Sequence, residues 1–164
     1  MNRIVILGTG HATVTRCYNT CFVLQTDTTT LLVDAGGGNG ILQRLKQTGI
    51  AIKDLHHMYV THAHTDHILG TIWVIRMVLS AAGYEGRFHI YSHAKVLRVI
   101  SMICGETLSA KHRRLMGERV VMHEVGDGTG FNVGDIGMQS FDIHSKKEPQ
   151  YGFRATLPGG AVVV

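Results

Sequence analysis

Residues 61–70 read Thr61-His62-Ala63-His64-Thr65-Asp66-His67-Ile68-Leu69-Gly70. Three imidazoles and one carboxylate fall within six positions of this stretch, a density that side-chain packing alone gives little reason to assemble. Neutral imidazole nitrogen and carboxylate oxygen suit Zn²⁺ and its divalent neighbours, and ligands close in sequence lose little chain entropy when they converge. The stretch therefore predicts a metal site. The competing interpretation is a polar loop in which Asp66 caps a helix.

The segments on either side of this histidine motif predict where it lies in the fold. Residues 55–61 alternate as a strand does, and residues 68–82 form an apolar stretch typical of a helix. His62 and His64 are separated by one residue, so in extended backbone their side chains point the same way, whereas Asp66 and His67 are adjacent and point differently. A strand-to-helix turn of this kind could serve two metals.

At this point the chain resembles the metallo-β-lactamase superfamily, whose signature is His-x-His-x-Asp-His after a strand, and within it the ribonuclease Z branch. The segments that carry the resemblance are Leu7-Gly8-Thr9-Gly10, Leu31-Leu32-Val33-Asp34-Ala35-Gly36, the histidine motif, and His144 followed by Tyr151-Gly152-Phe153-Arg154. The resemblance implies an α/β fold, an αββα sandwich of two mixed sheets packed face to face with helices outside, as one domain over residues 1–164.

The resemblance also implies roles for individual residues. His62, His64 and His144 would hold one metal, while Asp66 and His67 would belong to the second metal and to the catalytic centre. For His144 the alternative is that it shares the polar face of a strand with Asp142.

Three residues outside this set are candidates for supporting or substrate-contacting roles. The resemblance suggests that Asp34 supports the metal-site loop without binding the metal itself, with turn capping as its alternative. His11 and His93 each follow an expected strand, which makes them candidates for contact with substrate.

The implied cofactor is a pair of Zn²⁺ ions, with Mn²⁺ or Fe as alternatives. Two metals would hold a bridging hydroxide as nucleophile and act as Lewis acid, so phosphorus or a carbonyl could be attacked. The predicted function is a ribonuclease Z-like phosphodiesterase without the tRNA-gripping arm, because residues 151–154 run directly through Leu157-Pro158-Gly159-Gly160 into the last expected strand. The alternatives are another small-ester or lactone hydrolase, a β-lactamase, and a metal-binding remnant or binding module without turnover.

The resemblance further implies a later bridging aspartate and a final histidine, and neither is present in these 164 residues. Residues 161–164 resemble a strand cut short, so we expect the C-terminal part of the fold to be missing. The alternative is a homodimer in which a second chain supplies the missing strands and ligands, because an unfinished sheet edge invites pairing.

Composition is consistent with one α/β unit and a polyanionic substrate. Hydrophobic residues make up 45% of the chain, and 16 Lys and Arg against 12 Asp and Glu give a formal charge of +4. Lys111-His112-Arg113-Arg114 is a basic cluster that is either a solvated helix face or a contact for an RNA backbone. The substrate expected is a phosphodiester or a small ester, with RNA as an open alternative.

Several features favour a cytoplasmic protein without membrane contact. The apolar run after Met1 is too short for a signal peptide, no stretch is long enough to span a bilayer, and the three cysteines form an odd set. Cys17 and Cys21 could pair or bind metal, but burial is the commoner role. Nucleotide binding at Gly8-Thr9-Gly10 is disfavoured because the third glycine of a dinucleotide fingerprint is absent.

Strand and helix patterns alternate along the chain without internal repeats. The patterns predict further strands at residues 3–7, 21–25, 30–33, 88–91, 120–125 and 137–143, and further helices at residues 41–47, 94–103 and 106–117. The strands at 120–125 and 137–143 are expected to pair antiparallel across the glycine-containing turn region at 126–134.

Overall fold

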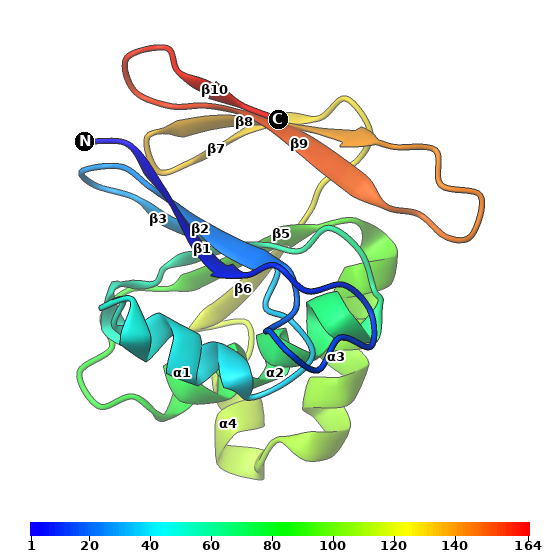
Figure 1. The fold of residues 1–164 in the computed structure, drawn as a ribbon. Coiled ribbons are helices and arrows are strands. Elements are labelled where there is room, and N and C mark those ends of the chain that lie inside the picture. Colours follow the sequence, from blue (N-terminus) through cyan, green and yellow to red (C-terminus); the bar gives the residue numbers. More distant parts are fainter.

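The computed structural model describes residues 1–164 and contains two β-sheets packed face to face, with helices on the outer face of the larger sheet (Figure 1). The six-stranded sheet has the order β1 (Arg3–Gly8), β2 (Cys21–Gln25), β3 (Thr30–Val33), β4 (His57–Tyr59), β5 (Phe88–Ser92) and β6 (Val120–Glu124). The four-stranded sheet has the order β10 (Val162–Val163), β9 (Tyr151–Thr156), β8 (Ile136–Asp142) and β7 (Gly130–Val133). The predicted pair of facing sheets is confirmed.

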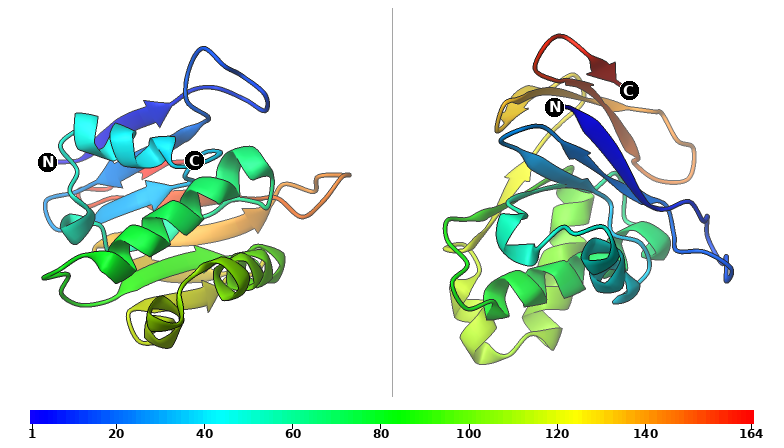
Figure 2. Two further views of the ribbon diagram at one scale, coloured as in Figure 1. Left: turned by 90° about the horizontal axis from the view of Figure 1, so that it is seen from below. Right: turned by 60° about the vertical axis from the view of Figure 1, so that its left-hand side comes forward.

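Four α-helices and one 3₁₀ turn accompany the larger sheet. The helices are α1 (Gly40–Gln47), α2 (Thr65–Ser80), α3 (Ala94–Thr107) and α4 (Ala110–Leu115), and the 3₁₀ turn covers Ile52–Asp54. Figure 2 shows these helices on one side of the larger sheet and the smaller sheet on the other. In α2 the residues Val74, Ile75 and Val78 are fully buried, which fixes this helix against the sheet.

Strand β3 lies between two hydrophobic cores. Leu32 packs into the core under the helices, whereas Leu31 and Val33 pack into the core between the sheets. Because side chains of a strand alternate between faces, a strand covered on both faces is apolar at every position. This explains the uninterrupted apolar run that precedes Asp34.

The direction of the strands places a functional edge on the larger sheet. Strands β1, β2 and β3 are antiparallel neighbours, and β3, β4, β5 and β6 are parallel. The carboxyl ends of parallel strands meet at one edge, where open α/β sheets bind ligands. The histidine motif leaves β4 at this edge.

Two sequence predictions about the second half of the chain are wrong. Strand β6 does not pair with β8, because β6 is parallel to β5 and β8 is antiparallel to β7 and β9. The expected turn region contains β7, and the chain turns back from β7 into β8 at Gly134 (φ 56°). The chain passes from the larger sheet to the smaller one between β6 and β7. The smaller sheet is antiparallel throughout rather than mixed.

The boundary between α3 and α4 also differs from the prediction of one helix over 106–117. Helix α3 continues to Thr107, and the Ser109 side chain caps α4 by accepting the backbone N–H of His112. A serine at this position satisfies an N–H that would otherwise lack a partner, so it favours a new helix start.

The burial expected for Cys17 and Cys21 is confirmed for Cys21 and wrong for Cys17, which is exposed. Cys17, Cys21 and Cys104 are free thiols, and Cys21 and Cys104 are buried in the helix-side core. No helix combines the length and the apolar character needed to cross a bilayer.

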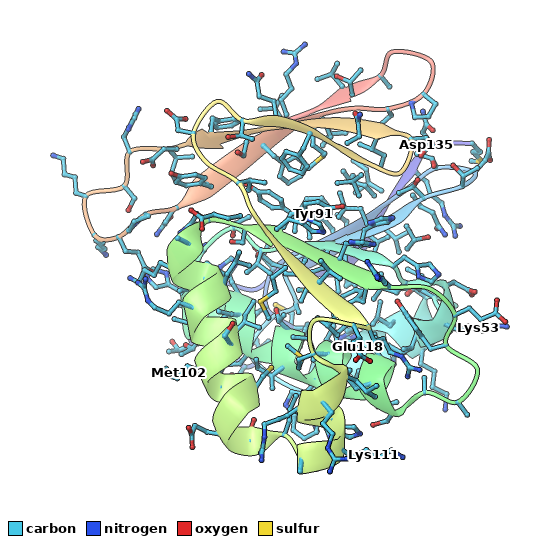
Figure 3. The ribbon with its side chains drawn as sticks, turned by 180° about the vertical axis from the view of Figure 1, so that it is seen from behind. Lys53, Tyr91, Met102, Lys111, Glu118 and Asp135 are labelled. Atoms are coloured by element: carbon cyan, nitrogen blue, oxygen red, sulfur yellow. The ribbon has the colours of Figure 1, made fainter.

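Three histidines on neighbouring strands, here called the histidine ladder, lie side by side on the inter-sheet face of β4, β5 and β6: His57, His89 and His123. The His57 and His89 rings are stacked with centroids 5.5 Å apart, and His89 Nδ1 lies 2.8 Å from His123 Nε2. Tyr91, seen between the sheets in Figure 3, stacks on His123 at 4.7 Å. Burial first, and then the neighbouring imidazoles, lower the pKa of His57 to about 4. His57 is therefore neutral in the folded protein near pH 7.

This ladder predicts a loss of stability on acidification. Between the ordinary histidine pKa of 6.5 and the value of about 4, the unfolded chain binds a proton at His57 that the folded chain does not. Stability therefore falls as the pH decreases through this window. His57→Leu should lose less stability than the unaltered protein between pH 7 and pH 4.5 in urea unfolding. Equal losses in the two proteins would contradict the assignment.

Candidate functional site

The histidine motif occupies the turn from β4 to α2, as the sequence predicts. The Val60 backbone N–H donates to Tyr91 O at 3.1 Å, so the end of β4 is tied to β5. Helix α2 begins at Thr65, and the preceding His64 has extended backbone (φ −66°, ψ 146°). The ring of His62 lies 4.6 Å from that of His64 and 4.1 Å from that of His67, measured between centroids. The motif imidazoles are thus gathered in one place.

Asp34 holds the two ends of the motif together. This aspartate follows β3, is 4% exposed, and has left-handed backbone (φ 54°). Its Oδ1 accepts the backbone N–H of Thr61 at 2.8 Å, and its Oδ2 accepts the Thr61 hydroxyl at 2.8 Å. Asp34 Oδ2 also lies 2.7 Å from His67 Nδ1. Since Nδ1 of His67 is engaged by Asp34, Nε2 is the nitrogen left to face the site.

The charges at this position affect the pKa of His67. Burial by itself lowers the pKa of this imidazole, but the hydrogen bond to Asp34 and the negative charges of Asp34 and Asp66 outweigh burial. The pKa of His67 is consequently raised. For His62, burial and the neighbouring His67 lower the pKa, so the two rings of this close pair differ in proton affinity.

Asp66 lies in the first turn of α2 and is fixed from another loop. Its Oδ2 accepts the backbone N–H of Ala12 at 2.8 Å and lies 3.5 Å from His67 Nε2. Burial raises the pKa of Asp66, while backbone hydrogen bonds and the two imidazoles lower it by more. The expected alternative, helix capping by Asp66, is not what the structure shows, because His64 is the N-cap residue.

Gly70 allows α2 to lie directly against the loop that follows Asp34. Its backbone N–H donates to Gly36 O at 2.8 Å, and a Cβ built at this glycine would lie 1.8 Å from Ala35 O. Any side chain here would push the helix away from the loop. The glycine at the end of the motif is therefore required by the close approach of two backbones.

The remaining predicted residues are not all brought to this cluster. His144 has left-handed backbone (φ 55°), its side chain is 84% exposed, and its one charged neighbour is Asp142, with His144 Nδ1 3.9 Å from Asp142 Oδ2. His11 is exposed in the loop after β1, next to Ala12. His93 is 5% exposed, precedes α3 and packs on the Tyr151 ring at 4.9 Å, and its Nε2 has no hydrogen-bond partner.

Sequence reasoning missed two residues at the site, Glu148 and Lys95. Glu148 Oε1 contacts His64 Nε2, and Lys95 Nζ donates to Glu148 Oε2 at 2.6 Å. Neither residue belongs to the motif or to a periodic pattern. The one available signal was the position of Glu148 between His144 and Tyr151, in a connection already assigned to the site.

The donor set of the motif fits a divalent cation by its chemistry. Imidazole nitrogens of His62, His64 and His67 and an oxygen of Asp66 are ligands that Zn²⁺ accepts, and Asp34 is the kind of outer partner that orients a ligating histidine. As the side chains stand, no group of three or more histidine, cysteine, aspartate or glutamate residues is arranged to hold an ion. The motif rings face one another, and His64 faces Glu148.

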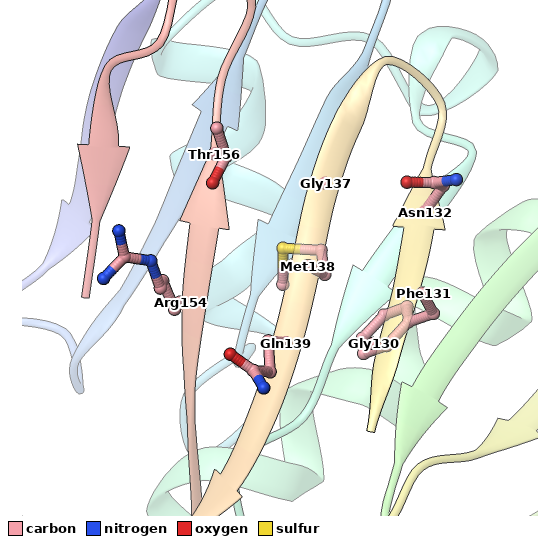
Figure 4. A pocket seen from close by; sticks show the side chains of 8 residues that line it. All are labelled: Gly130, Phe131, Asn132, Gly137, Met138, Gln139, Arg154 and Thr156. Atoms are coloured by element: carbon pink, nitrogen blue, oxygen red, sulfur yellow. The ribbon is translucent and has the colours of Figure 1, made fainter. Parts of the chain in front are cut away.

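A separate hollow lies on the outer face of the smaller sheet (Figure 4). Its volume is about 400 Å³, and it is lined by Gly130, Phe131, Asn132, Gly137, Met138, Gln139, Arg154 and Thr156. Arg154, one of the residues that carry the family resemblance, thus lines a surface hollow that contains no residue of the histidine motif.

Comparison with known proteins gives consistent matches. A sequence family described as "Anti-Pycsar protein Apyc1" matches residues 2–156. A ribonuclease Z of Mycolicibacterium gilvum is 25% identical over 100% of this chain and 60% of its own length. A ribonuclease Z of Aeropyrum pernix is 30% identical over 85% of this chain and 42% of its own length. The chain therefore spans only part of these curated relatives.

Solved structures confirm the fold. The short form of human tRNase Z superimposes with a TM-score of 0.76 and 18% identity, over 99% of this chain and 66% of that chain. At this identity the likeness shows the metallo-β-lactamase-type fold and nothing finer.

The role of Asp34 predicts a change in the proton affinity of His67. Asparagine tolerates the left-handed backbone of this position, so Asp34→Asn removes the charge with little backbone strain. The pKa of His67 should fall, because burial remains while the hydrogen bond and charge of Asp34 are lost and only the charge of Asp66 still opposes burial. Histidine ring signals followed by NMR over pH in the metal-free protein measure this pKa. Asp54→Asn is the matched control, and an unchanged His67 pKa in Asp34→Asn would contradict the contact.

Proposed function

The chain belongs to the family of anti-Pycsar Apyc1 proteins and to the ribonuclease Z-like part of the metallo-β-lactamase superfamily, and on this premise we propose that it is a metal-dependent phosphodiesterase. The observation that carries the proposal is the buried Asp34 carboxylate that fixes His67 Nδ1 at 2.7 Å, beside Asp66. This arrangement leaves Nε2 of His67 and the carboxylate of Asp66 directed to one place.

Under this proposal the motif holds divalent ions, with zinc as the first choice and manganese or iron as alternatives. His62 and His64 would hold one ion together with His144, and Asp66 and His67 would hold the second. Such ions supply a Lewis acid and activated water. For His144 to take part, the connection between β8 and β9 must turn it inward, since its side chain is 84% exposed.

The protein's own residues contribute orientation and charge. Asp34 and Thr61 hold the motif at the end of β4, and the Ala12 N–H holds Asp66 at 2.8 Å. Helix α2 starts within the motif, and the positive end of its dipole favours a substrate phosphate there. These groups are in place before substrate binds, which is the condition under which electrostatic stabilisation is effective.

The substrate that we propose is a small phosphodiester. Strand β9 is followed directly by a turn in which Leu157 N donates to Ala161 O at 2.8 Å, and β10 begins at Val162. No insertion separates these strands, so no arm for a large RNA extends from this place. Another small ester is the alternative substrate of the same site.

A contact with RNA through the basic cluster Lys111–Arg114 would be remote from the motif. The cluster lies on α4, and Ser80 Oγ at the C-terminal end of α2 lies 3.2 Å from His112 Nε2. Helix α2 has 16 residues and begins at the motif, so its far end lies about 24 Å away. The cluster could therefore bind a distant part of an RNA backbone but not the phosphodiester at the motif.

Loss of a motif histidine should remove metal and activity together. His64→Ala should lower the zinc, iron and manganese content measured by plasma mass spectrometry, and the hydrolysis of bis(p-nitrophenyl) phosphate should fall at least tenfold. His112→Ala, on α4, is the matched control. Unaltered metal content in His64→Ala would rule out the metal assignment. If His64→Ala loses metal but the unaltered protein itself hydrolyses no ester, the result would instead favour a metal-binding module without turnover.

The basic cluster gives an independent prediction about RNA. Arg113 Nη1 already donates to Leu108 O at 2.6 Å, so Lys111 and Arg114 are the freer cations. If the cluster binds an RNA backbone, Lys111→Ala with Arg114→Ala should weaken binding of a single-stranded RNA and lower the slope of log K against log salt by about 1.4. An unchanged slope would exclude this surface, while the activity on the small ester should be the same in both proteins.

A further inference from the structure

The connection between β8 and β9, residues 143–150, lies beside the histidine motif. At its base the Ile143 N–H donates to Gln150 O at 3.1 Å, and the Tyr151 N–H donates to Thr61 O at 3.0 Å. Thr61 is the residue before His62. In Figures 1 and 2 this connection projects on the same side of the molecule as the loop after β1, which carries Ala12. The smaller sheet therefore delivers a segment of its own to the site.

Two side chains of this connection point in opposite senses. His144 is 84% exposed, whereas the side chain of Glu148 is only 11% exposed. Glu148 Oε1 contacts His64 Nε2, and Lys95 Nζ donates to its other oxygen at 2.6 Å. Lys95 lies in the first turn of α3, so three separate elements meet at this carboxylate.

The Glu148 carboxylate lies between the Lys95 ammonium and the His64 imidazole. The contact is made to Nε2 of His64, a nitrogen that would otherwise be free for a metal. Divalent zinc accepts carboxylate oxygen and imidazole nitrogen in the same site. Asp66 is the one carboxylate that the motif itself offers, so a further oxygen ligand matches what a site for two ions requires.

We propose that Glu148 is a metal ligand that shares with His64 the cation of the histidine motif, and that Lys95 positions its carboxylate. This inference rests on the proposed metal site. It assigns to the connection between β8 and β9 a ligand other than His144. The cation would take the place between Glu148 Oε1 and His64 Nε2, while Lys95 keeps Oε2 and thereby fixes the direction of the carboxylate.

The test is a titration of the metal-free protein with Co²⁺, followed by calorimetry and by the visible absorption of the bound ion. Glu148→Gln retains shape but replaces the carboxylate by a weak amide ligand, so the Co²⁺ affinity should fall at least tenfold and the absorption spectrum should change. Lys95→Met should weaken binding less, because it removes only the positioning contact. Glu106→Gln, on α3, is the matched control and should bind as the unaltered protein does.

Three further variants separate the possible outcomes. His144→Ala should lower the affinity less than Glu148→Gln does, and the opposite order would assign the ligand of this connection to His144 and overturn the role of Glu148. His62→Ala should remove the ion that His62 and His64 hold, and binding equal to that of the unaltered protein would overturn the proposed function itself. Loss of this ion in His62→Ala, together with unchanged affinity and spectrum in Glu148→Gln, would overturn only the role of Glu148. If Glu148→Gln does not fold, Glu148→Asp keeps the charge but withdraws the oxygen, and an unaltered spectrum there would equally overturn the proposal.

Discussion

The buried carboxylate of Asp34 is the constraint on which the site depends. It joins the end of β3 to the end of β4 through Thr61, and both strands to the start of α2 through His67. A buried charge is costly unless its partners are all in place, so these three elements can approach one another only in an arrangement that supplies them. The position of the motif is thus determined by the same interaction that makes burial of this aspartate tolerable.

The layers of the fold make this arrangement rigid. Helix α2 is held against the larger sheet by Val74, Ile75 and Val78, and at its start Gly70 lets the helix backbone touch the loop after Asp34. Motif residues on such a helix and at the end of such a strand have little freedom to move. Rigid elements of this kind hold reactive side chains more accurately than a loop on the surface does.

The smaller sheet has a different relation to the site. It packs on the larger sheet through an apolar core and contributes one connection, residues 143–150, to the region of the motif. Within this connection Glu148 faces the motif and His144 faces solvent. The first sheet therefore provides fixed groups, whereas the second provides a segment whose side chains decide how the site is completed. The remote basic cluster on α4 belongs to neither part.

The sequence by itself determined the histidine motif and its place between a strand and a helix, because these follow from ligand spacing and from the periodicity of apolar residues. The two facing sheets were expected from the resemblance to the metallo-β-lactamase superfamily. The same resemblance indicated Asp34 as a residue that supports the metal-site loop. The sequence could not place Glu148 against His64, because that contact joins residues 84 positions apart through the packing of two sheets. Nor could it predict that β6 and β8 lie in different sheets, since strand pairing depends on which apolar faces meet, and only the tertiary structure decides that.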